Sequence, residues 1–318
     1  MDYEELKAIL TEKVLFSSKY LTDDILESKD LSFMYTRFTI KKKSGKSRIL
    51  HAPHATLKAL QHELMYKVLN EFTFMSQVHG FTRGKSVKTG ALVHVGCEGL
   101  VNMDLKDFFS KFPISLINIA VVKTIRKAIK LGYIAEEQEN NINLHRFLVK
   151  LITINNYELS QGAPTSPLIT NLGMMKVDAT IVKFIKDLVD YKGALIYSRY
   201  ADDITVSSSV AEIDFMSEIV IPINRILSYN TLNLNFAKTR IQRKHKRMEV
   251  TGVVVNEKLS IPKWKYYAMR AKIHNLSKIG KISADEYQKT MGYLQWMIYL
   301  KPQTSQKMLD TLKGLEVV

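Results

Sequence analysis

The chain has 318 residues, 46% of them hydrophobic, so it can bury a large interior and should contain more than one subdomain. Its formal net charge of +15 favours a polyanionic partner. No segment approaches the ~18 apolar residues of a membrane span, and the acidic, mixed N-terminus is unlike a signal peptide, so we expect a cytoplasmic protein without membrane contact. The single cysteine, Cys97, excludes an internal disulfide and a cysteine-rich zinc site, is expected in the core, and leaves carboxylates to bind any metal.

Apolar periodicity and turn residues predict an α+β chain without internal repeats or long linkers. Strands are expected within 35–50 (two, joined at Ser44-Gly45), 100–104, 195–208 (a hairpin) and 248–255. Helices are expected over 4–29 with a break near 22–24, 56–69, 114–131, 143–154, from the end of the 160–171 loop to about 190, 212–227, 262–278, 284–300 and 304–312. Propensity alone supports this fold class and nothing finer.

The first chemical feature is a carboxylate at the end of a short apolar strand. Residues 100–104, Leu-Val-Asn-Met-Asp, are expected to form a strand that ends at Asp104 and turns into a helix. A helix N-cap role for Asp104, with Phe108 and Phe109 in the core, is the alternative interpretation.

The second feature is the small-residue loop Ser160-Gln-Gly-Ala-Pro-Thr-Ser-Pro-Leu-Ile-Thr-Asn171. Its glycine and two prolines break local structure just before the long helical pattern. Such a loop lets backbone approach a flat ligand closely.

The third feature is the adjacent pair Asp202 and Asp203 between two strand-like runs. Neighbouring side chains of a regular strand point to opposite faces, so both acids reach one centre only where the strand breaks, as in a turn at Tyr200-Ala-Asp-Asp203. Together with Asp104 they have the donors for two divalent cations ~3.5–4 Å apart, with Mg²⁺ expected and Mn²⁺ as the alternative. Asp104 and Asp202 are the expected bridging ligands, and Asp203 is the less certain one.

These three motifs, in this order and spacing, resemble those of reverse transcriptases. The loop from Gln161 to Asn171 resembles the nucleotide- and template-contacting loop, residues 200–203 the Tyr-x-Asp-Asp box, and residues 103–109 the strand with the first metal-binding Asp. The resemblance covers about residue 35 to the C-terminus. It implies a right-hand polymerase, an RNA-directed DNA polymerase, with fingers at 35–98 and part of 114–160, a palm at 99–255, a helical thumb at 256–318 and a helical segment at 1–34.

The resemblance also assigns further side chains. The nucleotide-binding (dNTP) candidates that it implies are Arg48, Lys43, Lys46, Phe109 and Gln161. Phe109 corresponds to the aromatic gate that blocks a 2′-hydroxyl, with Phe108 as the alternative, and Gln161 should lie near the nascent pair. Lys238 corresponds to the general acid near the leaving pyrophosphate, with an ordinary surface lysine as the alternative interpretation.

Two segments narrow the resemblance to bacterial retron reverse transcriptases. Val250-Thr-Gly252 resembles a region peculiar to them, and Ala91 and His94 match an Asn-Ala-x-x-His signature in which Gly90 replaces the Asn. This implies priming from a 2′-hydroxyl of a structured noncoding RNA, an RNA–DNA hybrid and a single-stranded DNA product joined to RNA, template removal by a host ribonuclease H, and antiphage defence with a separate effector protein. The alternatives are a group II intron-like or diversity-generating reverse transcriptase, or a catalytically silent RNA-binding protein.

The C-terminal third carries most of the excess charge. Between Lys238 and Lys281 there are 13 Lys and Arg against two acids, a local net charge of +11. Such a strip should bind nucleic-acid phosphates. The candidate side chains are Lys263, Lys265, Arg270, Lys272, Arg243, Lys244 and Arg247. We expect Trp264 and Tyr267, in the same helix, to be core residues rather than stacking platforms.

Overall fold

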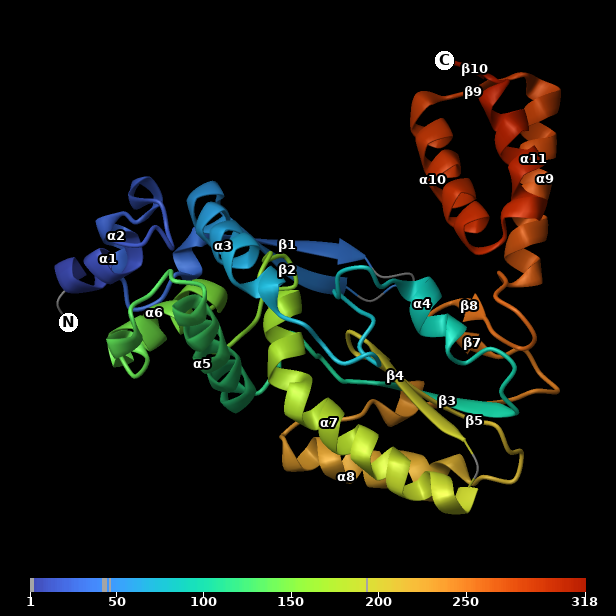
Figure 1. Ribbon diagram of the computed structural model, residues 1–318. Coiled ribbons are helices and arrows are strands. Elements are labelled where there is room, and N and C mark those ends of the chain that lie inside the picture. The colour runs from blue at the N-terminus through green and yellow to red at the C-terminus, as the bar shows by residue number, and fades with distance from the viewer. Residues whose placement is uncertain (1–2, 42–44, 46, 193) are drawn as a thin grey trace.

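The computed structural model describes residues 3–41, 45, 47–192 and 194–318. The expected mixture of helices and antiparallel strands is confirmed (Figure 1). None of the described helices is both long and apolar enough to span a membrane.

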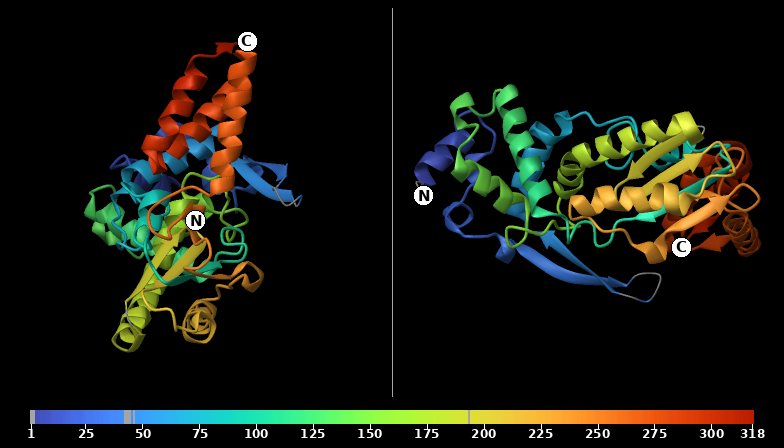
Figure 2. Two further views of the ribbon diagram at one scale, coloured as in Figure 1. Left: turned by 90° about the vertical axis from the view of Figure 1, so that its right-hand side faces the viewer. Right: turned by 90° about the horizontal axis from the view of Figure 1, so that it is seen from below.

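Helices and a two-stranded hairpin make up the N-terminal part. The hairpin pairs β1 (Tyr35–Lys41) with β2 (Ser47–Pro53), antiparallel, and Figure 2 shows it projecting from the helices around it. The helices are α1 (Tyr3–Thr11), α2 (Asp23–Glu27), α3 (Ala55–Lys67), α5 (Ile114–Lys130) and α6 (Ile142–Ile152). The predicted helix over 4–29, with a break near 22–24, is confirmed only at α1 and α2: after α1 the chain turns at Val14, whose φ is +56°, and buries Leu15 and Phe16.

A four-stranded antiparallel sheet, the central sheet, lies in the middle of the chain with the order β4-β5-β3-β6. Its strands are β3 (Gly99–Asp104), β4 (Leu195–Tyr200), β5 (Asp203–Ser208) and β6 (Arg240–Arg243). Alternate residues Val101, Met103, Ile204 and Val206 join the main core. That core includes residues of α7 (Ser166–Lys192), of the π-helical turn Phe215–Val220 and of α8 (Ile221–Tyr229), which cover this face of the sheet (Figures 1 and 2).

Two predictions in this region need correction. Residues 105–111 after Asp104 form turns rather than a helix, because Asp107 has a φ of +51° and α5 begins only at Ile114. Residues 248–255 are not one strand but a hairpin of β7 (Glu249–Val250) and β8 (Val253–Val254). Thr251 and Gly252, both with positive φ, make the two-residue turn that suits the twist of a hairpin.

The C-terminal bundle consists of α9 (Lys263–Ile279), α10 (Ala284–Leu300) and α11 (Pro302–Lys313), and it stands at the end of the molecule opposite the N-terminal helices (Figure 1). Short strands β9 (Lys281–Ile282) and β10 (Glu316–Val317) pair beside it. The bundle shares a second core with Ala91 of α4 (Val87–Leu92), with Cys97, and with Leu100 on the other face of the central sheet. The expected burial of Cys97 is confirmed.

His94, just after α4, fastens this second core to the sheet. Its ring is fully buried, and its two nitrogens lie 2.7 Å from the hydroxyls of Ser207 and Ser198 on neighbouring strands. Burial lowers the pKa of His94 to about 3, so the ring stays neutral at physiological pH.

We expect His94 to make the fold acid-sensitive. The unfolded chain protonates the His94 ring below a pKa of ~6.5, whereas the folded chain does so only near pH 3. The contribution of His94 to stability is therefore complete above pH 6.5. It is lost as the pH falls towards 3, at about 1.4 kcal/mol per pH unit. A His94→Gln variant, which keeps a donor and an acceptor, should therefore show a shallower fall in unfolding free energy between pH 6.5 and 4.5, measured by urea denaturation. The exposed control His245→Gln should follow the parent; equal slopes for the parent and His94→Gln would contradict the assignment.

Candidate active site

Two of the predicted carboxylates face each other across neighbouring strands. Asp104, the last residue of β3, lies directly opposite Asp203, the first residue of β5. The amide of Leu105 donates to the carbonyl of Asp202 at 3.0 Å, which makes the Asp104–Asp203 position a non-hydrogen-bonded pair, the kind with the closer side chains. The sheet register therefore brings together acids that lie far apart in sequence.

Asp202 lies in the turn that joins β4 to β5, residues Tyr200–Asp203, which we call the acid turn. Tyr200 and Asp203 pair, so Ala201 and Asp202 are its two central residues. Ala201 has a φ of +55°, at a position where glycine is the usual choice in hairpins. The strand direction breaks here as the sequence predicted, and the break costs conformational energy that other contacts must offset.

A buried ion pair beneath the acid turn supplies such contacts. Arg199 and Asp178 of α7 are fully buried and form a bidentate pair, with Nε–Oδ1 and Nη2–Oδ2 distances of 2.7 Å. Arg199 Nη1 also donates to the carbonyl of Ala201 at 3.0 Å and to Oδ1 of Asn171 at 3.1 Å. The Tyr197 hydroxyl donates to Asp178 at 2.7 Å. The guanidinium thus joins the strained turn to the helix that follows the 160–166 loop.

The acid turn is electrostatically unfavourable for its carboxylates. Burial, followed by repulsion from Asp202 and Asp104, raises the pKa of Asp203 to about 6. The pKa of Asp202 is also raised, by burial first and by Asp104 second, while Lys238 and Arg48 oppose the shift. Bound positive charge would relieve this repulsion.

Lys238 supplies part of that charge. Its Nζ lies 2.8 Å from Oδ1 and 3.0 Å from Oδ2 of Asp104. It ends a 3-10 turn (Phe236–Lys238) held beside β3 by the amide of Asn235, which donates to the carbonyl of Asp104 at 2.8 Å. Sequence reasoning placed Lys238 near the leaving group, and the structure brings it to the first carboxylate.

The donor chemistry fits divalent cations, which prefer hard carboxylate oxygens. Asp104, Asp202 and Asp203 contribute three neighbouring carboxylates, and the charge of Asp104 raises the pKa of both Asp202 and Asp203. Within the part of the chain that the structure describes, no three acidic, histidine or cysteine side chains converge as an assembled metal site.

The other nucleotide-binding candidates differ in their exposure and in what they contact. Arg48 on β2 acts on Asp202 electrostatically, so the hairpin directs positive charge towards the acid turn. Gln161 is exposed, in a loop packed so closely on β2 that a Cβ at Gly162 would come within 2.6 Å of the His51 carbonyl oxygen. Phe109 is half-buried, whereas Phe108 is a core residue. Lys43 and Lys46 lie outside the described residues.

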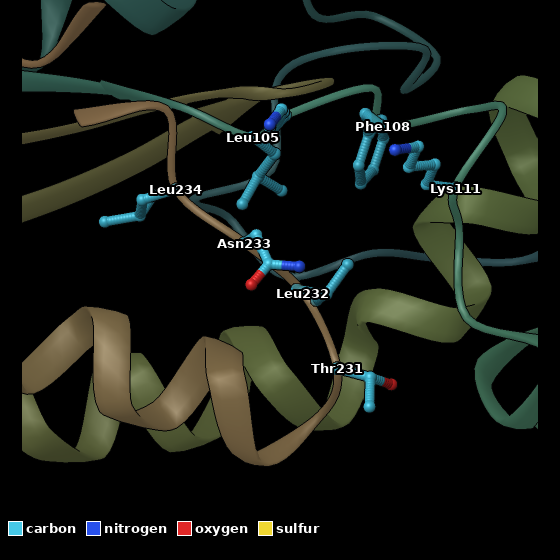
Figure 3. Close-up of a pocket in the computed structure, with 8 residues that line it drawn as sticks. Leu105, Phe108, Lys111, Thr231, Leu232, Asn233 and Leu234 are labelled. Atoms are coloured by element: carbon cyan, nitrogen blue, oxygen red, sulfur yellow. The ribbon is translucent and has the colours of Figure 1, made fainter. Parts of the chain in front are cut away.

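A pocket of about 300 Å³ opens beside the turns that follow Asp104 (Figure 3). Its walls are Leu105, Lys106, Phe108, Lys111 and the segment Thr231–Leu234. Asp104, Asp202 and Asp203 do not line it, so it is separate from the carboxylates. The amide of Lys106 donates to the carbonyl of Asn233 at 2.8 Å, and this bond joins the two walls.

The predicted nucleic-acid-binding cations divide into two groups. Lys263 and Arg270 are exposed on α9, and half-buried Lys265 lies over the rings of Trp264 and Trp296. The others have local partners: Lys244 pairs with Glu98, Arg247 with Glu249, and Lys272 with Glu286, while Arg243 lies over the Phe215 ring and donates to the Ile213 carbonyl. Exposed ion pairs are weak and can yield to phosphate, but Arg243 is part of the packing.

The expectation that Trp264 and Tyr267 are core residues is wrong. They are 61% and 58% exposed. Helix α9 faces the second core with Ile273 and Leu276, and Tyr266 and Met269 pack against it, which turns the two other aromatics outward. The exposed face of α9 thus presents rings together with cations, a composition suited to nucleic acid.

The two segments that resemble retron enzymes come together in space. Ala91 shares the second core with Val250 and Val253, the residues on either side of the Thr251-Gly252 turn. Gly90, the departure from the signature, is in close contact with His79: a Cβ there would come within 3.3 Å of the His79 Cβ. The His79 side chain therefore takes up space that an Asn at 90 would need.

A family model described as reverse transcriptase (RNA-dependent DNA polymerase) matches residues 40–255. The chain belongs to this family. It is 30% identical over 294 residues to the retron Ec86 reverse transcriptase of Escherichia coli, covering 89% of this chain and 82% of that protein. It is 29% identical over 283 residues to the retron Mx65 reverse transcriptase of Myxococcus xanthus, covering 86% of this chain and 63% of the relative. The predicted membership of the bacterial retron reverse transcriptases is confirmed.

Solved structures support the fold of this reverse transcriptase family member. Apo telomerase from Candida tropicalis superposes with a TM-score of 0.51 at 11% identity, over 88% of this chain and 56% of that one. A form truncated from the C-terminal domain gives 0.50 at 12% identity, over 73% and 56%. The predicted right-hand polymerase fold is confirmed.

Sequence reasoning missed the residues that support the acid turn. Arg199 takes the third inward position of β4 after Leu195 and Tyr197. Asp178 lies on α7 between the buried residues Val177 and Ile181. The signal in the sequence is that β4 and α7 each carry one charged residue at a position where the pattern calls for an apolar one. Buried charges are rare unless they are paired, so these two charges indicate an ion pair.

We expect the Arg199–Asp178 pair to behave as a buried one. Arg199→Met leaves Asp178 charged and without its guanidinium, and should reduce the unfolding free energy by about 3–5 kcal/mol in urea denaturation. Arg199→Met/Asp178→Asn removes the charge and keeps an acceptor for Tyr197, so it should recover most of the loss. Arg126→Met, which breaks the exposed Arg126–Glu139 pair, should cost less than about 1 kcal/mol. A double variant as unstable as the single one would contradict this account.

Proposed function

We propose that the chain is the RNA-directed DNA polymerase of a retron, which copies part of a structured noncoding RNA into single-stranded DNA. The observation that carries the proposal is that Asp104 lies opposite Asp203 at the end of the central sheet, with Asp202 in the adjoining turn, in a reverse transcriptase family chain that is similar to retron enzymes. The clustered acids favour catalysis over a silent RNA-binding role, because like charges in one place are costly without bound cations.

Asp104, Asp202 and Asp203 would hold two Mg²⁺ ions, with Mn²⁺ as a substitute. When bound, the ions activate the attacking primer hydroxyl and stabilise the leaving oxygens. The chain itself contributes position and charge. Arg48 directs positive charge towards Asp202 from the hairpin, and Lys238 lies within reach of Asp104, where its proton can be donated towards the departing pyrophosphate.

The incoming deoxynucleotide would lie between the acids and the β1–β2 hairpin. In this proposal Arg48, Lys43 and Lys46 neutralise the triphosphate, and Gln161 lies beside the nascent pair. Phe109, five residues after Asp104, packs under the sugar and excludes a 2′-hydroxyl. Its half-buried ring, against the buried Phe108, supports this choice between the two phenylalanines.

The RNA–DNA duplex would follow the basic face of α9 in the C-terminal bundle. Exposed Lys263 and Arg270 are suited to phosphates, and the rings of Trp264 and Tyr267 to the groove or to unpaired bases. We assign the fingers, palm and thumb to 35–98 with part of 114–160, to 99–255 and to 256–318.

The retron relatives support the further proposals. Priming would use a 2′-hydroxyl of the cognate RNA, so RNA and DNA stay joined; a host ribonuclease H would remove the copied template. A separate effector protein would complete an antiphage defence. The chain spans 63% of the length of the Mx65 enzyme and 82% of the length of the Ec86 enzyme. The RNA, the ribonuclease H and the effector protein are therefore proposed as partners of the region that this chain shares with those enzymes.

The test is the nucleic acid that the protein retains in cells. We expect the purified chain to carry DNA joined to RNA, identified by separate ribonuclease and deoxyribonuclease treatment. An Asp202→Asn/Asp203→Asn variant should lack the DNA. The matched control Asp23→Asn/Asp24→Asn changes another adjacent acid pair, exposed on α2, and should retain it. RNA alone from all three proteins would contradict the proposal.

Lys238 should affect turnover more than nucleotide affinity. If it donates a proton, Lys238→Ala lowers kcat for primer extension about 10²-fold while KM for the deoxynucleotide changes little, and Lys238→Arg restores part of the rate. Steady-state extension on a defined primer–template measures both constants. Lys289→Ala, which removes an exposed lysine paired with Asp285 on α10, is the control. A higher KM with unchanged kcat would instead indicate a binding role.

A further inference from the structure

The segment Gly80-Phe81 lies against the acid turn from outside the predicted motifs. Gly80 is so close that a Cβ there would come within 2.4 Å of the Ala201 amide nitrogen, so only glycine fits. The Asn171 side-chain amide donates to the Gly80 carbonyl at 2.9 Å, and Asn171 in turn accepts from Arg199. The position of the next residue, Phe81, is therefore fixed relative to Ala201 and α7.

Phe81 has two unfavourable features. Its φ is +55°, in the left-handed region that side chains other than Gly, Asn and Asp rarely adopt, and its large apolar ring is 43% exposed. A core residue would be buried, and an ordinary turn residue would be small or polar. A strained, exposed ring beside the acid turn is therefore explained neither by burial nor by turn chemistry.

The neighbours of Phe81 show what it supports. Its ring centroid lies 6.5 Å from that of Phe109, at an interplanar angle of 70°, and 6.4 Å from that of Tyr200. Phe109 also meets Phe108 edge-on, with a centroid distance of 5.4 Å. Phe109 thus neighbours both a buried ring and an exposed one, and Phe81 connects it to Tyr200, the residue that begins the acid turn.

We propose that Phe81 is a positioning residue for sugar selection: it holds the Phe109 ring under the sugar of the incoming nucleotide, so that deoxynucleotides are preferred over ribonucleotides. This inference rests on the proposed polymerase function. Phe108 blocks movement of the Phe109 ring towards the core, and Phe81 blocks movement towards solvent. Without Phe81, Phe109 has room to turn aside, and a 2′-hydroxyl can enter without a clash.

The experiment compares single-nucleotide incorporation of dGTP and GTP on one primer–template. For Phe81→Ala we expect the ratio of kcat/KM for dGTP to that for GTP to fall about tenfold, within the range by which a pocket discriminates one small group. Phe81→Tyr retains the ring and should retain the ratio. Tyr229→Ala, which removes a 92% exposed ring at the end of α8, is the matched control.

A double-variant cycle tests whether Phe81 acts through Phe109. If it does, Phe81→Ala/Phe109→Ala is no more permissive for GTP than Phe109→Ala alone. Independent, multiplicative effects would overturn the positioning role. A lower rate with both nucleotides and an unchanged ratio in Phe81→Ala would show a purely structural role and would also overturn it. A parent protein that incorporates neither nucleotide would refute the polymerase function itself.

Discussion

The buried pair of Arg199 and Asp178 is the interaction on which the active-site geometry depends. The acid turn needs Ala201 in a conformation that alanine disfavours, and it must hold there carboxylates that repel one another. One guanidinium offsets the first cost by binding the Ala201 carbonyl, and it also ties the turn to α7 through Asp178 and Asn171. An Arg suits this role because its planar fork makes several directed bonds at once. The same side chain thus connects the helix after the 160–166 loop to the carboxylates.

The acid turn has well-bonded polar groups on its buried side and mutually repelling carboxylates on its exposed side. Beneath the turn, the polar groups of Arg199, Asp178 and Tyr197 bind one another in the interior. On the exposed side, Asp104 pairs with Lys238, whose side chain is 58% exposed. The buried hydrogen bonds and the hydrophobic cores therefore stabilise the site. The carboxylates at its surface still repel one another, and ion binding can relieve that repulsion.

The sequence predicted the fold class, the helices of the C-terminal bundle and the break in strand direction at Asp202, because periodicity and turn chemistry are local properties. It predicted the acids through their spacing and resemblance. It missed Arg199, Asp178 and Phe81, because a single charge or ring acquires its role only from residues that the fold brings near. The errors at Trp264 and Tyr267 have the same origin: composition marks α9 as amphipathic, but which face is buried depends on α10 and α11. At Thr251-Gly252 the sequence predicts one continuous strand, because both flanks have strand propensity, whereas the structure has a tight turn between two valines.

The second core has a consequence for how such enzymes can be recombined. It unites the C-terminal bundle with α4, the β7–β8 hairpin and Leu100 of the central sheet, segments that lie on both sides of the acid turn in sequence. A chimera that exchanged only residues 256–318 with those of a relative would set a foreign helical surface against native Ala91, Val250 and Val253. The unit of modular exchange is therefore discontinuous, and a domain graft should carry α4 and the β7–β8 hairpin together with the bundle.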